Sequence, residues 1–210
     1  MLFRSISAWE VHVSNSIFTG NRGDGRGGAI LAHSFDVIAS RFSTNEGLGG
    51  GAIAGDDGAI TSSTFSGNRS EGRGGAVYVE GNLNLSTSTF RGNRSIGATR
   101  DGTSCDGGGG GVWAHNAAIT SSDLIGNRAE AGTCANLDPE FWNHSAGVGG
   151  GLFVERTNGM SYGRFSRNDA AFLGGGAALF GEPNLDGLTF VRNVSGGWGG
   201  ALSIFRSEEH

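Results

Sequence analysis

Residues 65–77 read Phe-Ser-Gly-Asn-Arg-Ser-Glu-Gly-Arg-Gly-Gly-Ala-Val, and variants of this stretch recur along almost the whole chain. Each variant has a Phe-x-x-Asn pattern, with Leu for Phe in one copy, followed by two glycines and an apolar residue. The seven copies begin at Phe18, Phe42, Phe65, Phe90, Leu124, Phe165 and Phe190, and their asparagines are Asn21, Asn45, Asn68, Asn93, Asn127, Asn168 and Asn193. Self-similarity at a period of roughly 20–50 residues is typical of solenoid proteins.

The repeats differ in length at one place only. Successive Phe or Leu positions are 24, 23, 25, 34, 41 and 25 residues apart. The extra residues of the two long copies both lie between the asparagine and the glycines, and they form insertions at residues 94–109 and 128–149. Because these copies are adjacent in sequence, we expect the two insertions to leave the same corner of neighbouring coils.

The repeat unit predicts short strands and no long helix. Glycine makes up 41 of the 210 residues, and glycine disfavours helices. Short runs of β-forming residues, bounded by Gly, Asn and Ser, follow each glycine pair and precede each Phe. We therefore predict an all-β fold, a right-handed parallel β-helix of about seven coils, with residues 6–205 as a single domain. Its phenylalanines would stack in the core, and its asparagines, which tolerate left-handed backbone, would bond from coil to coil at a corner.

Composition excludes several other classes. The net charge is -5 and there is no lysine, so nothing favours nucleic acid as a partner. No apolar run is long enough for a transmembrane helix, so we expect membrane attachment only through flanking domains. Two cysteines do not make a zinc site by themselves, and we expect no metal and no cofactor.

The two ends of the chain share an unusual origin. One DNA segment, read on its two strands, accounts for both residues 1–5 and residues 206–210, and it resembles a sequencing-library adapter. We therefore expect an open reading frame from environmental DNA, with native sequence from residue 6 to residue 205 and a longer parent protein. The lack of a signal peptide is then uninformative.

The alternation of Phe-x-x-Asn with Gly-Gly-Ala-(Ile/Val/Leu) resembles the repeat of polymorphic outer membrane proteins, the chlamydial-type autotransported adhesins. It is also similar to bacterial right-handed parallel β-helix repeat proteins. The resemblance runs from about Phe18 to Phe205. It implies an exported bacterial protein, located outside the cell or on the outer-membrane surface.

The insertions hold the candidate site. Each carries one of the two cysteines, and we predict a Cys105–Cys134 disulfide, with two free thiols or a weak metal site as the alternatives. Loops on a rigid scaffold often carry function. The candidate binding residues are Arg100, Asp101, Asp106, Asp138, Glu140, Trp142 and His144. Trp142 has the chemistry to stack on a sugar, or it caps its loop against the coil.

The sequence favours a binding role over catalysis. We expect an adhesin-like rod that displays the loop pair to a surface glycan or to a protein of a host or neighbouring cell. The alternative is a polysaccharide lyase or glycoside hydrolase, which would need clustered carboxylates. Asp56 and Asp57 are adjacent, but neighbouring strand residues should point to opposite faces, and Asp57 has no evident partner in the next coils. Interrupted Ser/Thr columns at Thr61, Ser86 and Thr120 raise ice binding as a third idea.

Overall fold

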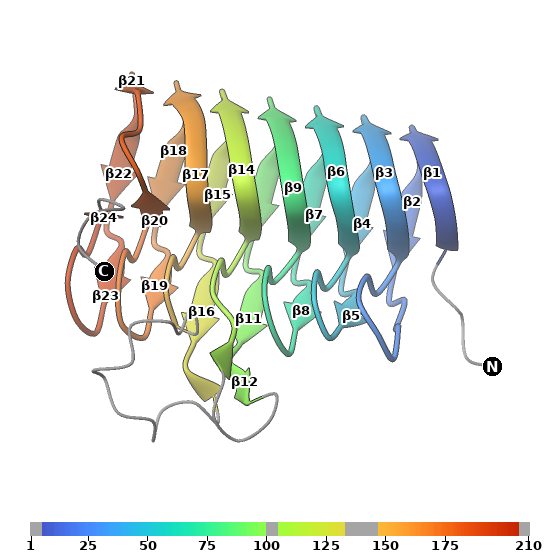
Figure 1. The fold of residues 1–210 in the computed structure, drawn as a ribbon, viewed down its shortest axis with the longest axis horizontal. Helices are drawn as coiled ribbons and strands as arrows, with labels where there is room; N and C mark the ends of the chain where they lie inside the picture. Colours follow the sequence, from blue (N-terminus) through green and yellow to red (C-terminus); the bar gives the residue numbers. More distant parts are fainter. Residues whose placement is uncertain (1–5, 100–104, 133–146, 206–210) are drawn as a thin grey trace.

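The protein is a parallel β-helix in which three parallel sheets run along a stack of coils (Figure 1). The computed structural model describes residues 6–99, 105–132 and 147–205. Within these ranges no helix is long and apolar enough to cross a membrane. The all-β solenoid predicted from the repeats is confirmed.

Most coils contribute one strand to each sheet in turn, but the first coil has no strand in the third sheet, and β20 and β21 of one coil both belong to the long sheet. The long sheet contains β1 (Ile6–Ser14), β3 (Ile30–Ile38), β6 (Ile53–Thr61), β9 (Val77–Ser86), β14 (Val112–Thr120), β17 (Leu152–Ser161), β20 (Ala177–Phe180), β21 (Leu185–Asp186) and β24 (Leu202–Phe205). The second sheet contains β2 (Ile17–Thr19), β4 (Arg41–Ser43), β7 (Thr64–Ser66), β10 (Thr89–Arg91), β15 (Asp123–Ile125), β18 (Arg164–Ser166) and β22 (Thr189–Val191). The third sheet contains β5 (Glu46–Gly47), β8 (Arg69–Ser70), β11 (Arg94–Ile96), β16 (Arg128–Glu130), β19 (Asp169–Ala170) and β23 (Val194–Ser195).

Equivalent apolar residues stack inside the coils. The rings of Phe42, Phe65 and Phe90 are fully buried and nearly parallel, with centroids 4.8 and 4.6 Å apart. Leu124 continues this column to Phe165. The ring separation matches the distance between hydrogen-bonded strands, so an identical side chain fits in every coil.

A hydrogen-bonded asparagine ladder closes the corner between the second and third sheets. The Asn68 Nδ2 donates to the Phe42 carbonyl at 3.1 Å and to Oδ1 of Asn93 at 2.9 Å. The Asn68 Oδ1 accepts from the backbone N–H and from the side-chain amide of Asn45, both at 3.0 Å. Each central asparagine is therefore buried with both its donors and its acceptor satisfied, as a buried amide requires.

The asparagines do not themselves take the left-handed backbone conformation that we expected of them. The residue before each asparagine takes it instead, with φ between 53° and 65°: Gly20, Thr44, Gly67, Gly92, Gly126, Arg167 and Arg192. The sharp turn at this corner is therefore made one residue before the asparagine.

The glycine corner explains why two glycines occur in each copy. Gly74 has a φ of +63°, and a Cβ added at Gly75 would overlap the carbonyl oxygen of Gly110 in the next coil.

The strand register also changes the alignment of the fourth copy with the third. Val77 pairs with Val112, so Gly111 stands where the third copy has Ala76, and the glycine pair equivalent to Gly74-Gly75 is one residue earlier than the Gly-Gly-apolar pattern suggests.

The two long connections leave strands that lie side by side. β11 pairs with β16, and the Gly97 N–H donates to the Glu130 carbonyl at 2.9 Å. After β11 the chain forms β12 (Ala98–Thr99), which pairs in antiparallel fashion with β13 (Cys105–Asp106).

Candidate functional site

The outer face of the long sheet carries two columns of side chains beside the glycine corner. Along each strand the alternation is regular: Ile30 and Ala32 face the core, whereas Leu31 and His33 face outward. The residues Ala8, Ala32, Gly55, Val79, Ala114 and Val154 pair with one another from strand to strand. The residue after each of them belongs to what we call the outer polar column: Trp9, His33, Asp56, Glu80, His115 and Glu155. The outer aromatic column consists of Tyr78, Trp113 and Phe153.

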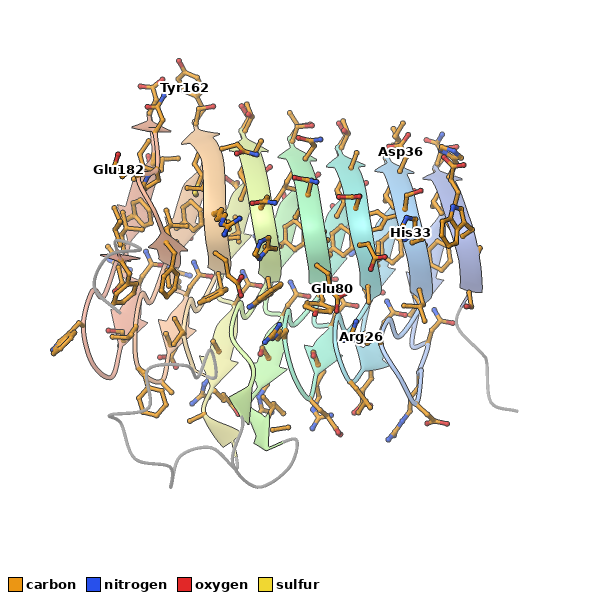
Figure 2. All side chains as sticks on the ribbon, viewed as in Figure 1. Arg26, His33, Asp36, Glu80, Tyr162 and Glu182 are labelled. Atoms are coloured by element: carbon orange, nitrogen blue, oxygen red, sulfur yellow. The ribbon has the colours of Figure 1, made fainter. Side chains whose placement is uncertain are left out.

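Histidines and carboxylates pair along the outer polar column. The His33 Nδ1 lies 2.6 Å from the Asp56 Oδ2, and the His33 ring stacks on Trp9 with centroids 4.1 Å apart. Three coils further on, the His115 Nδ1 lies 2.5 Å from the Glu155 Oε2. These side chains are partly exposed and hold one another in fixed orientations. Figure 2 shows His33 and Glu80 on this face.

Arg26, Tyr78 and Glu80 form a compact cluster beside the glycine corner, and Figure 2 labels Arg26 and Glu80 there. The Tyr78 hydroxyl donates to the Glu80 carboxylate at 2.8 Å, and Arg26 makes an ion pair with the same carboxylate. Burial, assisted by the Glu80 hydrogen bond, raises the pKa of Tyr78 to about 12. Burial alone would raise the pKa of Glu80, but the Tyr78 hydrogen bond and the Arg26 charge outweigh it and lower that pKa.

Two arginines make cation–π contacts with rings of the outer aromatic column. The Arg26 guanidinium lies 5.1 Å from the Tyr78 ring centroid, and the Arg73 guanidinium lies 4.6 Å from that of Trp113. Arg26 crosses Gly49, where a long side chain would fill the space next to Tyr78. Trp113 is only 2% exposed although its strand position faces outward.

The edge of the third sheet carries balanced charge. The Glu46 carboxylate makes ion pairs with two arginines. Its Oε2 lies 3.7 Å from the Arg22 Nη1, and its Oε1 contacts the Arg69 guanidinium. In later coils Glu130 accepts from Arg94 at 2.8 Å and lies 3.1 Å from Arg128. Most of these side chains are well exposed, so each pair contributes little stability. In the part of the chain that the structure describes, Arg22, Arg69, Arg94 and Arg128 are each paired with a carboxylate and form no unpaired cationic stripe along this edge.

Most of the candidate residues in the insertions lie outside the described residues. These are Arg100, Asp101, Cys134, Asp138, Glu140, Trp142 and His144. Cys105 and Asp106 are described only as part of the backbone of β13. The disulfide and the loop binding site therefore stay predictions.

Asp57 has the partner that the sequence did not reveal. Its Oδ1 accepts from the Asn82 backbone N–H at 2.8 Å and from the Asn82 Nδ2 at 2.9 Å, and these bonds lower the pKa of Asp57. The register shifts between Gly55 and Gly58, and neither Asp56 nor Asp57 is buried, so strict alternation fails here. Within residues 6–99, 105–132 and 147–205, no three His, Cys, Asp or Glu side chains group closely enough to hold a metal.

Sequence reasoning missed the two outer columns because their members differ in type from coil to coil. The signal lies in position: the polar column residue always comes three residues after the apolar residue that starts the strand, as His33 does after Ile30. Only the strand register makes that equivalence visible.

Comparison with known proteins supports the repeat assignment. The family model of the Chlamydia polymorphic membrane protein repeat matches residues 15–33 and 62–80. Both matches run from the second sheet through the asparagine and glycine corners into the long sheet. The chain thus carries repeats of the polymorphic membrane protein type. No curated protein and no solved structure matches the chain significantly.

Proposed function

We propose that this chain is part of an exported protein of a bacterial outer surface, where it acts as a rigid rod that displays the insertion pair to a partner or glycan outside the cell. The observation that carries the proposal is the match to the polymorphic membrane protein repeat. That name belongs to membrane proteins of Chlamydia, and the matched segments are the ones that build the coils here.

The rod suits such a role because its asparagine ladder is continuous. The asparagine bonds run without a break from Asn21 to Asn193. Function on a rigid scaffold concentrates in loops, and the two long connections leave paired strands. A partner would therefore meet both insertions together.

The register defines a variant that lacks the insertions and keeps the coils. The residue before the first corner glycine is Arg73 in the third copy, Gly108 in the fourth and Val148 in the fifth. Deleting residues 98–107 and 132–147 joins Gly97 to Gly108 and Ala131 to Val148. The two long repeats then become 24 and 25 residues long, like the others.

The test uses beads coated with the full chain, with the trimmed variant or with albumin, applied to cultured epithelial cells. We expect the full chain to adhere well above albumin and the trimmed variant to lose most of that excess, while its far-UV circular dichroism stays that of a β-helix. Adherence of the full chain at the albumin level contradicts surface binding. Unchanged adherence of a folded trimmed variant contradicts the role of the insertions.

A further inference from the structure

The strand β17 contains an irregularity at Asn158 and Gly159, in the interior of the rod. β17 lies between β14 and β20 in the long sheet, so a coil covers it on each side (Figure 1). Its register with β14 steps from Thr157, opposite Ala117, to Gly159, opposite Ala118. Asn158 is therefore the extra residue of a β-bulge.

The next coil also leaves this part of β17 unpaired. Leu152–Val154 pair with β20, and Met160–Ser161 pair with β21. Within the described range 147–205, neither register includes residues 155–159. Asn158 thus has no paired residue in the strands described on either side, and ladder pairing does not hold its backbone.

The surroundings of the bulge are open. The Asn158 side chain is exposed. Gly159 has a φ of +128°, a conformation that glycine adopts readily, and a Cβ placed there would approach nothing closer than the Asn184 carbonyl oxygen at 3.7 Å. The Gly159 N–H donates to the hydroxyl of Thr157, on the same strand, at 3.2 Å. The backbone nitrogen that follows Asn158 is therefore not shielded by a side chain of its own residue.

This residue pair has a well-defined chemistry. Asn158 is the only asparagine in the sequence that is followed by glycine. The backbone nitrogen after an asparagine attacks the side-chain amide carbon when the asparagine backbone is free to rotate, and a glycine there hinders the attack least. Asparagine is for this reason among the thermolabile residues.

From this geometry we propose that Asn158 is a site of self-modification, at which the folded chain loses the side-chain amide without an enzyme. The Gly159 nitrogen gives up its proton and forms a bond to the Asn158 Cγ. The Cγ–Nδ2 bond breaks, and the amide nitrogen takes up a proton and leaves as ammonia, so that a succinimide ring remains in the backbone. Water then opens the ring at either carbonyl carbon, which yields aspartate or isoaspartate. The net change consumes one water and releases one ammonia, so it needs no oxidant or reductant.

The other asparagines of the coils are held against this reaction. The central ladder asparagines are buried and use their side-chain amides in hydrogen bonds. On the outer face, Asn82 and Asn116 pair with each other, and Asn116 also pairs with Arg156. The residues that follow them, Leu83 and Ala117, pair with each other as well. A paired backbone must leave the sheet before its nitrogen can attack.

The sheet should survive the change. Because Asn158 already lies outside the register, the additional backbone atom of isoaspartate falls where the ladder is interrupted. Either product places a new negative charge at an exposed position of β17, two residues after Arg156. The surface charge of the rod thus changes with the age of the molecule. This chemistry requires only water and base, so it does not depend on the proposed surface role.

The test incubates the folded full chain in ¹⁸O-labelled water at mildly alkaline pH, and then digests it with trypsin in ordinary water for mass spectrometry. Ring opening takes its oxygen from water, so only carboxyl groups formed during the incubation carry the label. Cleavage after Arg156 and Arg164 releases residues 157–164, in which Asn158 is the only asparagine. We expect this peptide to exchange its amide for a labelled hydroxyl and to separate into aspartate and isoaspartate forms.

Two comparisons set the scale. Residues 74–91, which contain Asn82 and Asn84, should stay unmodified over the same period. A synthetic peptide of residues 157–164 reports the reaction without the fold. Asn158 in the folded chain should react within about tenfold of that peptide, since an unpaired residue needs little local opening.

The matched control variant is Ala117→Gly, in which Asn116 also precedes a glycine. Residues 116 and 117 are paired with β9 and with β17, so Asn116 should react more slowly than Asn158 while circular dichroism shows an intact β-helix. The proposal is overturned if Asn158 reacts more than about tenfold slower in the folded chain than in the peptide, because the bulge then protects it. It is also overturned if Asn116 in the folded variant reacts as fast as Asn158, since the sequence alone then decides the rate.

Discussion

Replacing Asn68 by alanine tests whether the asparagine ladder holds the corner. Asn45 and Asn68 are both fully buried. The change removes the Oδ1 that accepts the backbone N–H and the side-chain amide of Asn45, so two buried donors lose their acceptor. An unsatisfied buried donor costs about 1–3 kcal/mol, and two give about 2–6 kcal/mol. That loss is a large part of the 5–15 kcal/mol by which domains are typically stable.

The measurement is equilibrium unfolding in urea, followed by tryptophan fluorescence and by far-UV circular dichroism. The matched control is Asn21→Ala, at the partly exposed start of the ladder, where water replaces the lost bonds; its cost should be about 1 kcal/mol. A loss below about 1 kcal/mol for Asn68→Ala, or equal losses for the two variants, would refute the ladder as a source of stability.

A third variant separates hydrogen bonding from shape. Asn68→Asp keeps the side-chain volume but cannot donate to Phe42 or to Asn93 when ionised. Burial should raise the folded-state pKa of this carboxyl above its unfolded value. Stability should then fall as the pH rises through that interval, and it should partly recover in acid. A variant whose stability is independent of pH would contradict this account.

Four further outcomes are expected. Phe65→Ala should lower the unfolding free energy by about 3–5 kcal/mol in the urea assay, because it empties a fully buried position; a change under about 0.5 kcal/mol would show that the ring is not packed. Gly75→Ala should give little folded protein by circular dichroism, since the added Cβ overlaps a backbone oxygen, and a normal spectrum would argue against this close approach. Thiol titration under denaturing, non-reducing conditions should find Cys105 and Cys134 unreactive, and two reactive thiols would exclude the disulfide. Absorbance titration should show Tyr78 ionising near pH 12, so stability should decline between about pH 10 and pH 12 and decline less in Tyr78→Phe.

The fold could be predicted because every coil imposes the same demands at the same places. The second corner glycine, as at Gly75, leaves no room for a Cβ, so it reappears 14 or 15 residues before the next Phe or Leu. Such requirements do not depend on which coil is considered. The spacing between copies therefore predicted both the number of residues in a coil and the parallel pairing of equivalent strands.

The outer face could not be predicted in the same way. Trp9, His33 and Asp56 share a position and differ in chemistry, so no motif connects them. Their contacts arise only when strands about 4.8 Å apart bring one coil over the next. An offset of one residue is enough to misalign such positions in a comparison of sequences. Gly111, for example, is equivalent to Ala76 by strand register, whereas the Gly-Gly-apolar pattern aligns it with Gly75.

Since the backbone bonds between coils run parallel to the axis of the rod, a pull on its two ends loads them one layer after another. The layers should peel off singly, and each would release its whole turn of chain before the next one bears the force. A turn of 24 residues gives about 80 Å of slack at full extension. Under a pulling force between a cell and its target, the molecule would thus lengthen in steps, and each step would dissipate part of the mechanical work.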